Sequence, residues 1–278
     1  MTSLTGKATK SVAYAITALF AFFALFPFVW LVITSLKPAM EAFSIPPLWL
    51  FVPTLENYQT IMSSEWFGGF VSSFANSVII ASISTVLSIG VGILAAYSFA
   101  RFKTGGSGLP YFILSTRMFP QVAVIIPVYL LFYYLKLVDT HIAVGLSHTL
   151  FNLPFSVWML VGFLGSIPIE IEEAAMIDGC SRLGAFRRTV LPLAVPGIVV
   201  TAIFCFSFSW NEFLYALVLT GANTRTLPVM AISFVEPRGI VFGPLSATGV
   251  LTTLPSLVFA YLLRRHLVKG LTLGAVKQ

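Results

Sequence analysis

Six long apolar segments constrain this chain more than any other feature of its sequence. At about 1.5 Å of rise per residue, each is long enough to cross the roughly 30 Å hydrocarbon core of a bilayer as a helix. The sequence therefore predicts an all-α polytopic membrane protein with six transmembrane helices, in one transmembrane domain over residues 1–278. The segments lie near Val12–Leu36, Phe74–Ala100, Leu109–Leu135, Ile142–Gly165, Leu193–Thr220 and Leu245–Leu263.

The composition leads to the same conclusion. Charged residues make up 9% of the 278 positions and hydrophobic residues 58%, whereas soluble domains carry about 25% charged residues. So few charges could not cover the surface of a soluble domain. The net charge of +6 is not gathered into a basic run with interleaved aromatic residues, so no nucleic-acid partner is predicted. Cys180 and Cys205 fall in a loop and in a span, and imply no disulfide framework.

Lysine and arginine residues are unevenly distributed between the two sides of the predicted bundle. If the N-terminus is inside, eleven of the sixteen lie at the cytoplasmic side, four lie outside, and Arg117 lies within a span. Cytoplasmic segments of membrane proteins carry an excess of such residues. We therefore expect a multi-pass protein of the bacterial plasma (inner) membrane, with membrane lipid around it and with both termini, the loop 166–192 and the tail 264–278 in the cytoplasm.

The loop 166–192 is a polar segment between two apolar ones, with seven charged residues. Pro168 and the acids behind it suit the start of a helix. Gly179 suits the left-handed position that ends one. Ser181 can cap a second helix, with Pro192 as its stop. The loop therefore predicts two short helices joined by a glycine turn, outside the bilayer.

The same loop carries a spaced pattern that resembles the EAA loop of permease subunits from binding-protein-dependent ABC importers. In that pattern Glu-Ala-Ala is followed by glycine, nine residues, an aliphatic residue, any residue and Leu-Pro. One position departs, because Thr189 stands where the aliphatic residue is expected. The neighbouring Val190 makes this loss minor for packing. The matching residues are Glu173, Ala174, Ala175, Gly179, Leu191 and Pro192.

Five further stretches resemble one branch of these importers, the carbohydrate-uptake permeases for maltose, glycerol phosphate and polyols. Within that branch, the chain is similar to the shorter second permease of a heterodimeric pair. The stretches are Ile33-Thr34-Ser35-Leu36-Lys37-Pro38, Asn76-Ser77, Arg117-Met118-Phe119-Pro120, Trp210-Asn211-Glu212-Phe213 and a tail motif over residues 267–277.

The resemblance implies a type I ABC importer permease fold and a set of partners. A second, homologous permease completes the path, an extracytoplasmic solute-binding protein delivers the solute, and two ATPase subunits bind ATP-Mg and drive transport. The loop helix enters a cleft on an ATPase, and the tail also reaches the ATPases. The residues that take the coupling roles here are Glu173, Ala174, Ala175, Asp178, Gly179, Leu191 and Pro192.

This chain is expected to be a transport subunit and not an enzyme. It contains no G-x-x-x-x-G-K-[ST] loop, so ATP hydrolysis is expected from a partner. No metal site and no cofactor are predicted in the chain itself.

Polar residues inside the predicted spans are candidates for the solute path. A charge at bilayer depth costs at least about 2.5 kcal/mol unless it is paired or hydrated. Arg117 therefore either has a functional or packing partner or reaches toward the interface. Asn152, Asn211 and Glu212 either line the path or bond neighbouring helices, and His148 suits the second role. Tyr215 is the fifth candidate for the path.

Two expectations concern the packing of the spans. Ser84, Ser88, Gly92 and Ala96 recur at every fourth residue, and such a stripe lets another helix approach closely. In the third apolar segment, Pro120 and Pro127 predict a kinked helix.

Two other functions are open to a polytopic membrane protein, but the sequence lacks the signals of both. An ion-coupled secondary transporter of a small polar solute would show two halves with matching interrupted spans, and the sequence has no such repeat. A polytopic membrane enzyme would need a catalytic motif, but the three histidines are scattered and no intramembrane carboxylate pair occurs. Glycosides, polyols and glycerol phosphates all remain open as the solute.

Overall fold

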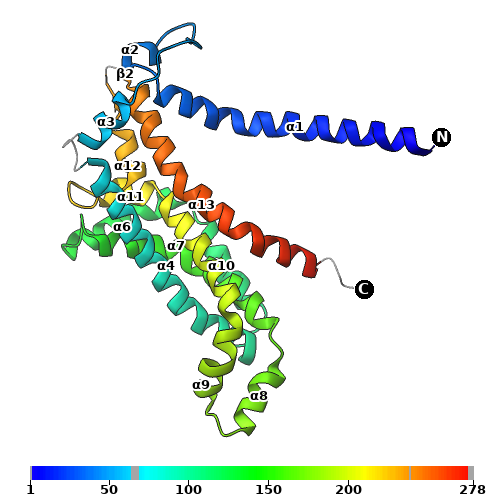
Figure 1. Cartoon of the computed structure of the whole chain (residues 1–278). Helices are drawn as coiled ribbons and strands as arrows, with labels where there is room; N and C mark the ends of the chain where they lie inside the picture. The colour runs from blue at the N-terminus through cyan, green and yellow to red at the C-terminus, as the bar shows by residue number, and fades with distance from the viewer. Residues whose placement is uncertain (1, 64–68, 238, 275–278) are drawn as a thin grey trace. The chain divides into compact units, whose positions relative to one another are not determined.

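The computed structural model describes residues 2–63, 69–237 and 239–274, and most of them are helical (Figure 1). Within these residues, five helices are long and apolar enough to cross a membrane. A bent pair, Gly108–Met118 with Gln121–Tyr134, makes a sixth span if it is counted as one. The predicted all-α fold with six spans is confirmed. The five are Lys10–Ser35, Gly69–Phe102, His141–Gly165, Arg182–Trp210 and Phe242–Leu262.

The contacts divide the chain into two compact units, residues 1–65 with 231–254 and residues 66–230 with 255–278. The single transmembrane domain expected over residues 1–278 stays a prediction. The backbone of the predicted tail is helical as far as Gly274, and residues 275–278 lie outside the described residues.

The first unit contains α1 (Thr2–Ser35), α2 (Ala39–Ala42), α3 (Glu56–Ser63) and the antiparallel pair β1 (Val235–Glu236) and β2 (Gly239–Ile240), in which Val235 pairs with Ile240. The amide of Asn57 is buried and donates to the carbonyls of Ser35 (2.9 Å) and Lys37 (2.7 Å). These bonds satisfy carbonyl groups that the end of α1 leaves without a partner. They fix α3 against the end of α1.

The second unit is built around three packed helices. The helix α7 packs along α4, and α10 packs against both. Shorter elements complete the unit and are named here in chain order. They are α4 (Gly69–Phe102), α5 (Gly108–Ser115), a 3₁₀ turn (Thr116–Met118), α6 (Gln121–Tyr134), α7 (His141–Gly165), α8 (Ile169–Ile177), α9 (Arg182–Ala185), a π-helical turn (Phe186–Val190), α10 (Leu191–Trp210) and α11 (Leu214–Leu219). The short α12 (Leu227–Ile232) begins in this unit, and α13 (Phe242–Gly274) ends in it.

The stripe of small residues on α4 is the contact face for α7, as predicted. Ser84, Ser88, Gly92 and Ala96 are all buried. The hydroxyl of Ser156 donates to the carbonyl of Ser88 at 2.9 Å. A Cβ atom added to Gly92 would collide with the Ser156 hydroxyl. Only a stripe of such small side chains permits this close approach.

The third span is broken where the sequence predicted a kink. Its two halves meet at 87°. Phe119 is extended (φ −61°, ψ 133°) and Pro120 precedes α6. Proline disfavours the helical conformation in the residue before it, which explains the position of the break. Pro127 lies inside α6 and does not end it.

The fifth span corrects two expectations. It was predicted over Leu193–Thr220, but α10 ends at Trp210 and a separate α11 begins at Leu214. The predicted stop at Pro192 is also wrong, since the helix runs from Arg182 through the π-helical turn into α10. A proline is tolerated in the first turn of a helix, and the wider π-helical turn ahead of it changes the hydrogen-bond register.

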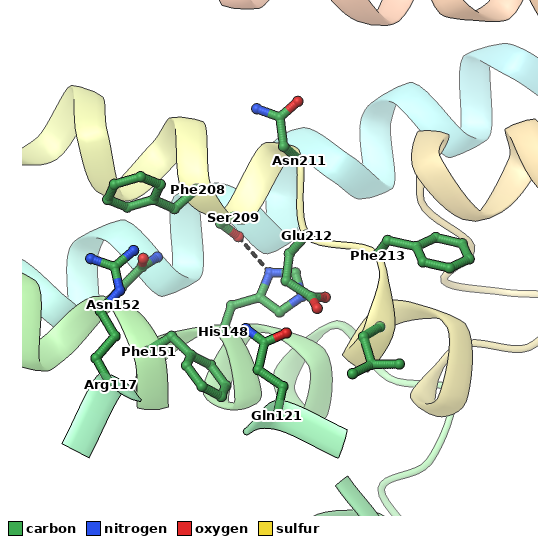
Figure 2. Close-up of a pocket in the computed structure, with 11 residues that line it drawn as sticks. Arg117, Gln121, His148, Phe151, Asn152, Phe208, Ser209, Asn211, Glu212 and Phe213 are labelled. Atoms are coloured by element: carbon green, nitrogen blue, oxygen red, sulfur yellow. Dashed lines mark hydrogen bonds and ion pairs between the residues drawn. The ribbon is translucent and has the colours of Figure 1, made fainter. Parts of the chain in front are cut away.

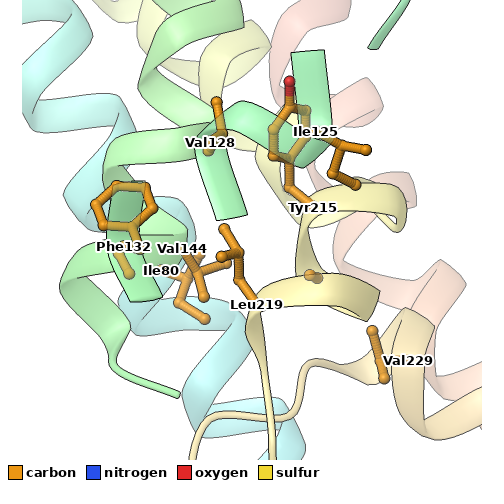
Figure 3. Close-up of a cluster of buried hydrophobic side chains, with 10 residues drawn as sticks. Ile80, Ile125, Val128, Phe132, Val144, Tyr215, Leu219 and Val229 are labelled. Carbon is orange, nitrogen blue, oxygen red and sulfur yellow. The ribbon is translucent and has the colours of Figure 1, made fainter. Parts of the chain in front are cut away.

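A cluster of buried apolar side chains holds α6 and α11 against α4 and α7 (Figure 3). It takes residues from five helices, so it fixes the segment between α10 and α11 in place. Its members labelled in Figure 3 are Ile80, Ile125, Val128, Phe132, Val144, Tyr215, Leu219 and Val229.

The loop after α11 is tied down by Asp139, which lies between α6 and α7. The carboxylate of Asp139 accepts hydrogen bonds from the backbone amides of Gly221 (2.8 Å), Asn223 (3.2 Å) and Thr224 (3.0 Å). The side chains of Asn223 and Thr224 also donate to it, at 2.8 and 2.7 Å. Asn76 on α4 donates to the carbonyl of Asn223 at 3.0 Å. This loop is therefore rigidly attached to the helical core.

Candidate functional site

The polar loop begins as the sequence predicts, with the short helix α8 and a glycine turn, but the second predicted helix continues into α10. At the end of α8, the amide of Gly179 donates to Met176 O (3.1 Å) and the amide of Cys180 donates to Ala175 O (3.0 Å). Gly179 has φ +92°. This is the glycine-dependent C-terminal motif of helices. The hydroxyl of Ser181 then accepts from the amide of Gly184 (3.2 Å) and caps α9.

The predicted coupling residues divide between an exposed and a buried face. Glu173 and Ala174 are exposed, as are Asp178 and Gly179, whereas Ala175 is buried. The outer face of α8 therefore presents one acid, one small side chain and a glycine turn. Such a face can enter a narrow cleft, because it projects little bulk.

The end of the coupling pattern lies at the start of α10. Leu191 packs against a buried cluster that includes Leu164, Phe186 and Val190, and Pro192 is exposed. The hydroxyl of Thr189, the position that departs from the family pattern, donates to the carbonyl of Ala185 at 2.5 Å. Its polar group is thereby satisfied within the helix.

Glu172 is a site residue that sequence reasoning missed. Its side chain is 5% exposed, and its Oε2 lies 2.9 Å from Nε of Arg101, the last basic residue of α4. The hydroxyl of Tyr97 donates to its Oε1, and Arg101 also donates to the carbonyl of Ile167 at 3.1 Å. Glu172 therefore ties α8 to the end of α4. Sequence position alone shows this acid only as one of several in the first turns of α8.

A polar pocket lies where the third and fifth spans are interrupted (Figure 2). Its volume is about 380 Å³. It brings together four of the five predicted path residues, namely Arg117, Asn152, Asn211 and Glu212. The other lining residues are Gln121, His148, Phe151, Phe208, Ser209, Phe213 and Leu214.

His148 and Glu212 lie in contact at the centre of this pocket (Figure 2). Nε2 of His148 lies 2.9 Å from Oε2 of Glu212, and Nδ1 lies 2.5 Å from the hydroxyl of Ser209. The Glu212 carboxylate also accepts from the amides of Tyr215 (3.0 Å) and Ala216 (3.1 Å). It therefore caps α11, which explains why the helix restarts here. His148 both lines the pocket and connects α7 to the segment after α10.

The remaining path candidates have different surroundings. The Asn152 amide is buried and donates to the hydroxyl of Ser84 and to the carbonyl of Cys205, both at 2.9 Å. Asn211 is exposed and donates to Ser207 O at 2.8 Å. The structure does not bring Tyr215 to the pocket. Its ring is fully buried, 5.1 Å from the ring of Phe151, because the cap at Glu212 turns this face of α11 to the core.

Arg117 extends over two aromatic rings. Its Cζ lies 4.2 Å from the ring centroid of Phe208 and 5.0 Å from that of Phe155. Gln121, which sequence reasoning also missed, begins α6 directly after the break at Pro120 and lines the same pocket. The break itself was the signal that could have indicated it.

The comparisons with known proteins agree with this architecture. In the solved structures, the chain resembles a bacterial ABC transporter involved in the import of the acidic polysaccharide alginate, with a TM-score of 0.76 at 19% identity over 95% of this chain and 98% of that one. The fold is thus that of an ABC importer permease.

A family model also matches the chain. The model for the inner membrane component of binding-protein-dependent transport systems matches residues 88–273, and the chain belongs to this family. A probable ABC transporter permease protein of Sinorhizobium fredii is 34% identical over 278 residues, covering 100% of this chain and 99% of that protein. A trehalose/maltose transport system permease protein of Thermococcus litoralis is 35% identical over 262 residues, covering 93% and 94%. The recognition based on the EAA loop is confirmed. The fold and the family are those of ABC importers, not of ion-coupled secondary transporters.

Proposed function

We propose that this chain is one of two permease subunits of a carbohydrate importer in the bacterial inner membrane, with both termini and the loop 166–192 in the cytoplasm. The two permeases form the path, an extracytoplasmic solute-binding protein delivers the solute, and two ATPase subunits supply the energy from ATP-Mg. The trehalose/maltose permease among the relatives supports the carbohydrate class.

The observation that carries this proposal is the build of the α8 loop. Its exposed face offers Glu173, Ala174 and the Gly179 turn, whereas its inner face is bound to α4 through Glu172. An element that docks on an ATPase and transmits its movement needs an exposed face for docking and an inner face that is bound to the membrane helices. Because α4 packs along α7, and α7 carries His148 and Asn152, a displacement of α8 reaches the pocket through packed helices.

The pocket suits a polyhydroxylated solute. Its amide, hydroxyl and carboxylate groups can bond sugar hydroxyls, and the rings of Phe151, Phe208 and Phe213 offer flat apolar faces. Ligand pockets combine these two kinds of surface. The exact solute is set by the pocket together with the binding protein.

Reconstitution tests the proposal directly. The assembled importer in proteoliposomes, with its binding protein outside, should take up at least one labelled carbohydrate from a panel of neutral and acidic sugars, including trehalose and maltose, only when ATP is enclosed. Collapse of proton and sodium gradients should leave that uptake unchanged. Uptake by the chain without its ATPases, driven by an ion gradient, would contradict the proposal.

A further inference from the structure

Arg117 is a cation that no acid neutralises within the described part of the chain. Its guanidinium forms neither an ion pair nor a hydrogen bond with a described residue, and its contacts are the rings of Phe155 and Phe208. Ring faces attract a cation, but they accept none of the five guanidinium N–H groups in ordinary hydrogen bonds. A charge inside a membrane bundle is expensive and indicates a ligand or a partner.

Glu212 shares the pocket but does not serve as the counterion. Its Oε1 is bound by the amide of Tyr215, and its Oε2 by Nε2 of His148 and the amide of Ala216. These three contacts hold the carboxylate of Glu212 at the start of α11. Among the described residues, Arg117 therefore has no ion-pair partner.

The geometry points to an anion subsite at Arg117 that binds the acidic group of a substituted carbohydrate, a carboxylate, sulfonate or phosphate on a sugar. This inference rests on the proposed function, because it assigns a solute class to the same pocket. A guanidinium binds two oxygens of such a group side by side.

The surroundings of Arg117 suit the rest of such a sugar. Gln121 makes no side-chain hydrogen bond with a described residue, so its amide is available for a ring hydroxyl. The Phe208 ring, 4.2 Å from the guanidinium carbon, can pack on the C–H face of the sugar. The volume of about 380 Å³ lies at the small end of ligand pockets, roughly 300–1,000 Å³. We therefore expect the subsite to hold one acidic sugar unit of the solute.

The local potential can be measured without transport. Gln121→Cys is introduced as the probe in the assembled importer in lipid nanodiscs. Cys180→Ser and Cys205→Ala remove the native thiols of this chain, and the partner subunits carry no cysteine. The rates of modification by an anionic (sulfonatoethyl) and a cationic (trimethylammonium-ethyl) methanethiosulfonate are compared. The positive charge of Arg117 speeds the reaction of the anionic reagent and slows that of the cationic one. Arg117→Gln should therefore lower the ratio of the anionic to the cationic rate roughly fivefold or more. Arg117→Lys should largely preserve it. As a control, Lys136→Gln removes an exposed cation outside the pocket and should leave the ratio unchanged.

A protection assay needs no change at Arg117. Galacturonate and galactose differ by one carboxylate, and each is tested for slowing the reaction of the Gln121→Cys probe thiol with a neutral thiosulfonate. Half-protection should need about tenfold less galacturonate, the gain expected for a charge-assisted hydrogen bond. Equal protection by the two sugars, or an unchanged rate ratio in Arg117→Gln, would overturn the inference. The proposed function fails by a different result, the absence of ATP-driven uptake of any carbohydrate, neutral or acidic.

Discussion

Glu172 and Glu173 are adjacent acids with opposite surroundings. Glu172 is buried in its contacts with Arg101 and Tyr97, whereas Glu173 is exposed. Successive side chains of a helix point about 100° apart, so one helix turn can serve packing and docking at once. We therefore expect Glu172 to hold α8 in place and Glu173 to be free for docking.

We predict different effects for Glu172→Gln and Glu173→Gln. Glu172→Gln leaves the buried Arg101 without a counter-charge, which should weaken the anchoring of α8 by about 3 kcal/mol, or roughly a hundredfold in the local opening equilibrium. Amide hydrogen exchange over residues 169–182 should therefore accelerate. Glu173→Gln should leave that exchange unchanged and reduce retention of the ATPase. Equal exchange in both variants would contradict the assignment.

Glu212 is the residue whose substitution best tests the pocket. Glu212→Gln keeps the shape of the side chain but places an N–H₂ group where acceptors meet His148 and the start of α11. Uptake should fall about tenfold, as expected for one lost charge-assisted contact, or the preference among solutes should change, while the complex still assembles. Glu236→Gln, which alters an exposed acid in β1, is the control. A complex that no longer assembles would assign Glu212 to helix packing instead.

The turn between α8 and α9 depends on Gly179 for its backbone alone. A Cβ atom at this position would meet nothing within 4 Å, but φ is +92°. Gly179→Val should therefore cost about 1 kcal/mol or more by backbone strain and disturb docking without affecting the spans. The measurement is co-purification of the ATPase with a membrane-inserted permease. Gly162→Val has open space and ordinary helical geometry, and should retain the ATPase. Equal retention of the ATPase in the two variants would argue against a role of the turn in docking.

The loop after α11 should respond to pH through Asp139. Burial tends to raise the pKa of this carboxyl, but the hydrogen bonds from Thr224, Gly221 and Asn223 together lower it. A lowered folded-state pKa means that the stabilisation is complete above the unfolded-state pKa of about 3.9 and is lost as pH falls below it. Amide exchange of residues 221–224, corrected for its intrinsic pH dependence, should accelerate below about pH 4. The acceleration should be absent in Asp139→Asn, and its persistence there would exclude this carboxyl as the cause.

Local signals in the sequence predicted much of this architecture, because they need only neighbouring residues. The cap at Ser181, the turn at Gly179 and the break before Pro120 are of this kind. The bond between Arg101 and Glu172 joins positions 71 residues apart, and no local pattern indicates it. The end of α10 at Trp210 was missed because the apolar run continues past it, whereas the cap by Glu212 restarts the helix. The pocket was partly predicted from isolated polar residues, but their grouping depends on two separate breaks.

At the scale of the whole molecule, α1 presents a large uncovered apolar surface. None of its most apolar stretch between Lys10 and Ser35 is buried within the chain. So large an apolar surface must be covered by lipid or by another subunit. Both kinds of cover are available to a permease subunit in a membrane.

The central claim is that the outer face of α8 docks on an ATPase, and site-directed crosslinking tests it most directly. Ala174 is exposed and Ala175 is buried, so two neighbouring alanines form a matched pair. In an assembled, active importer carrying Cys180→Ser, Ala174→Cys should crosslink to a cysteine placed in the ATPase cleft, whereas Ala175→Cys and Lys103→Cys should do so far less. Crosslinking that is absent at Ala174→Cys, or equal at all three positions, would contradict the account.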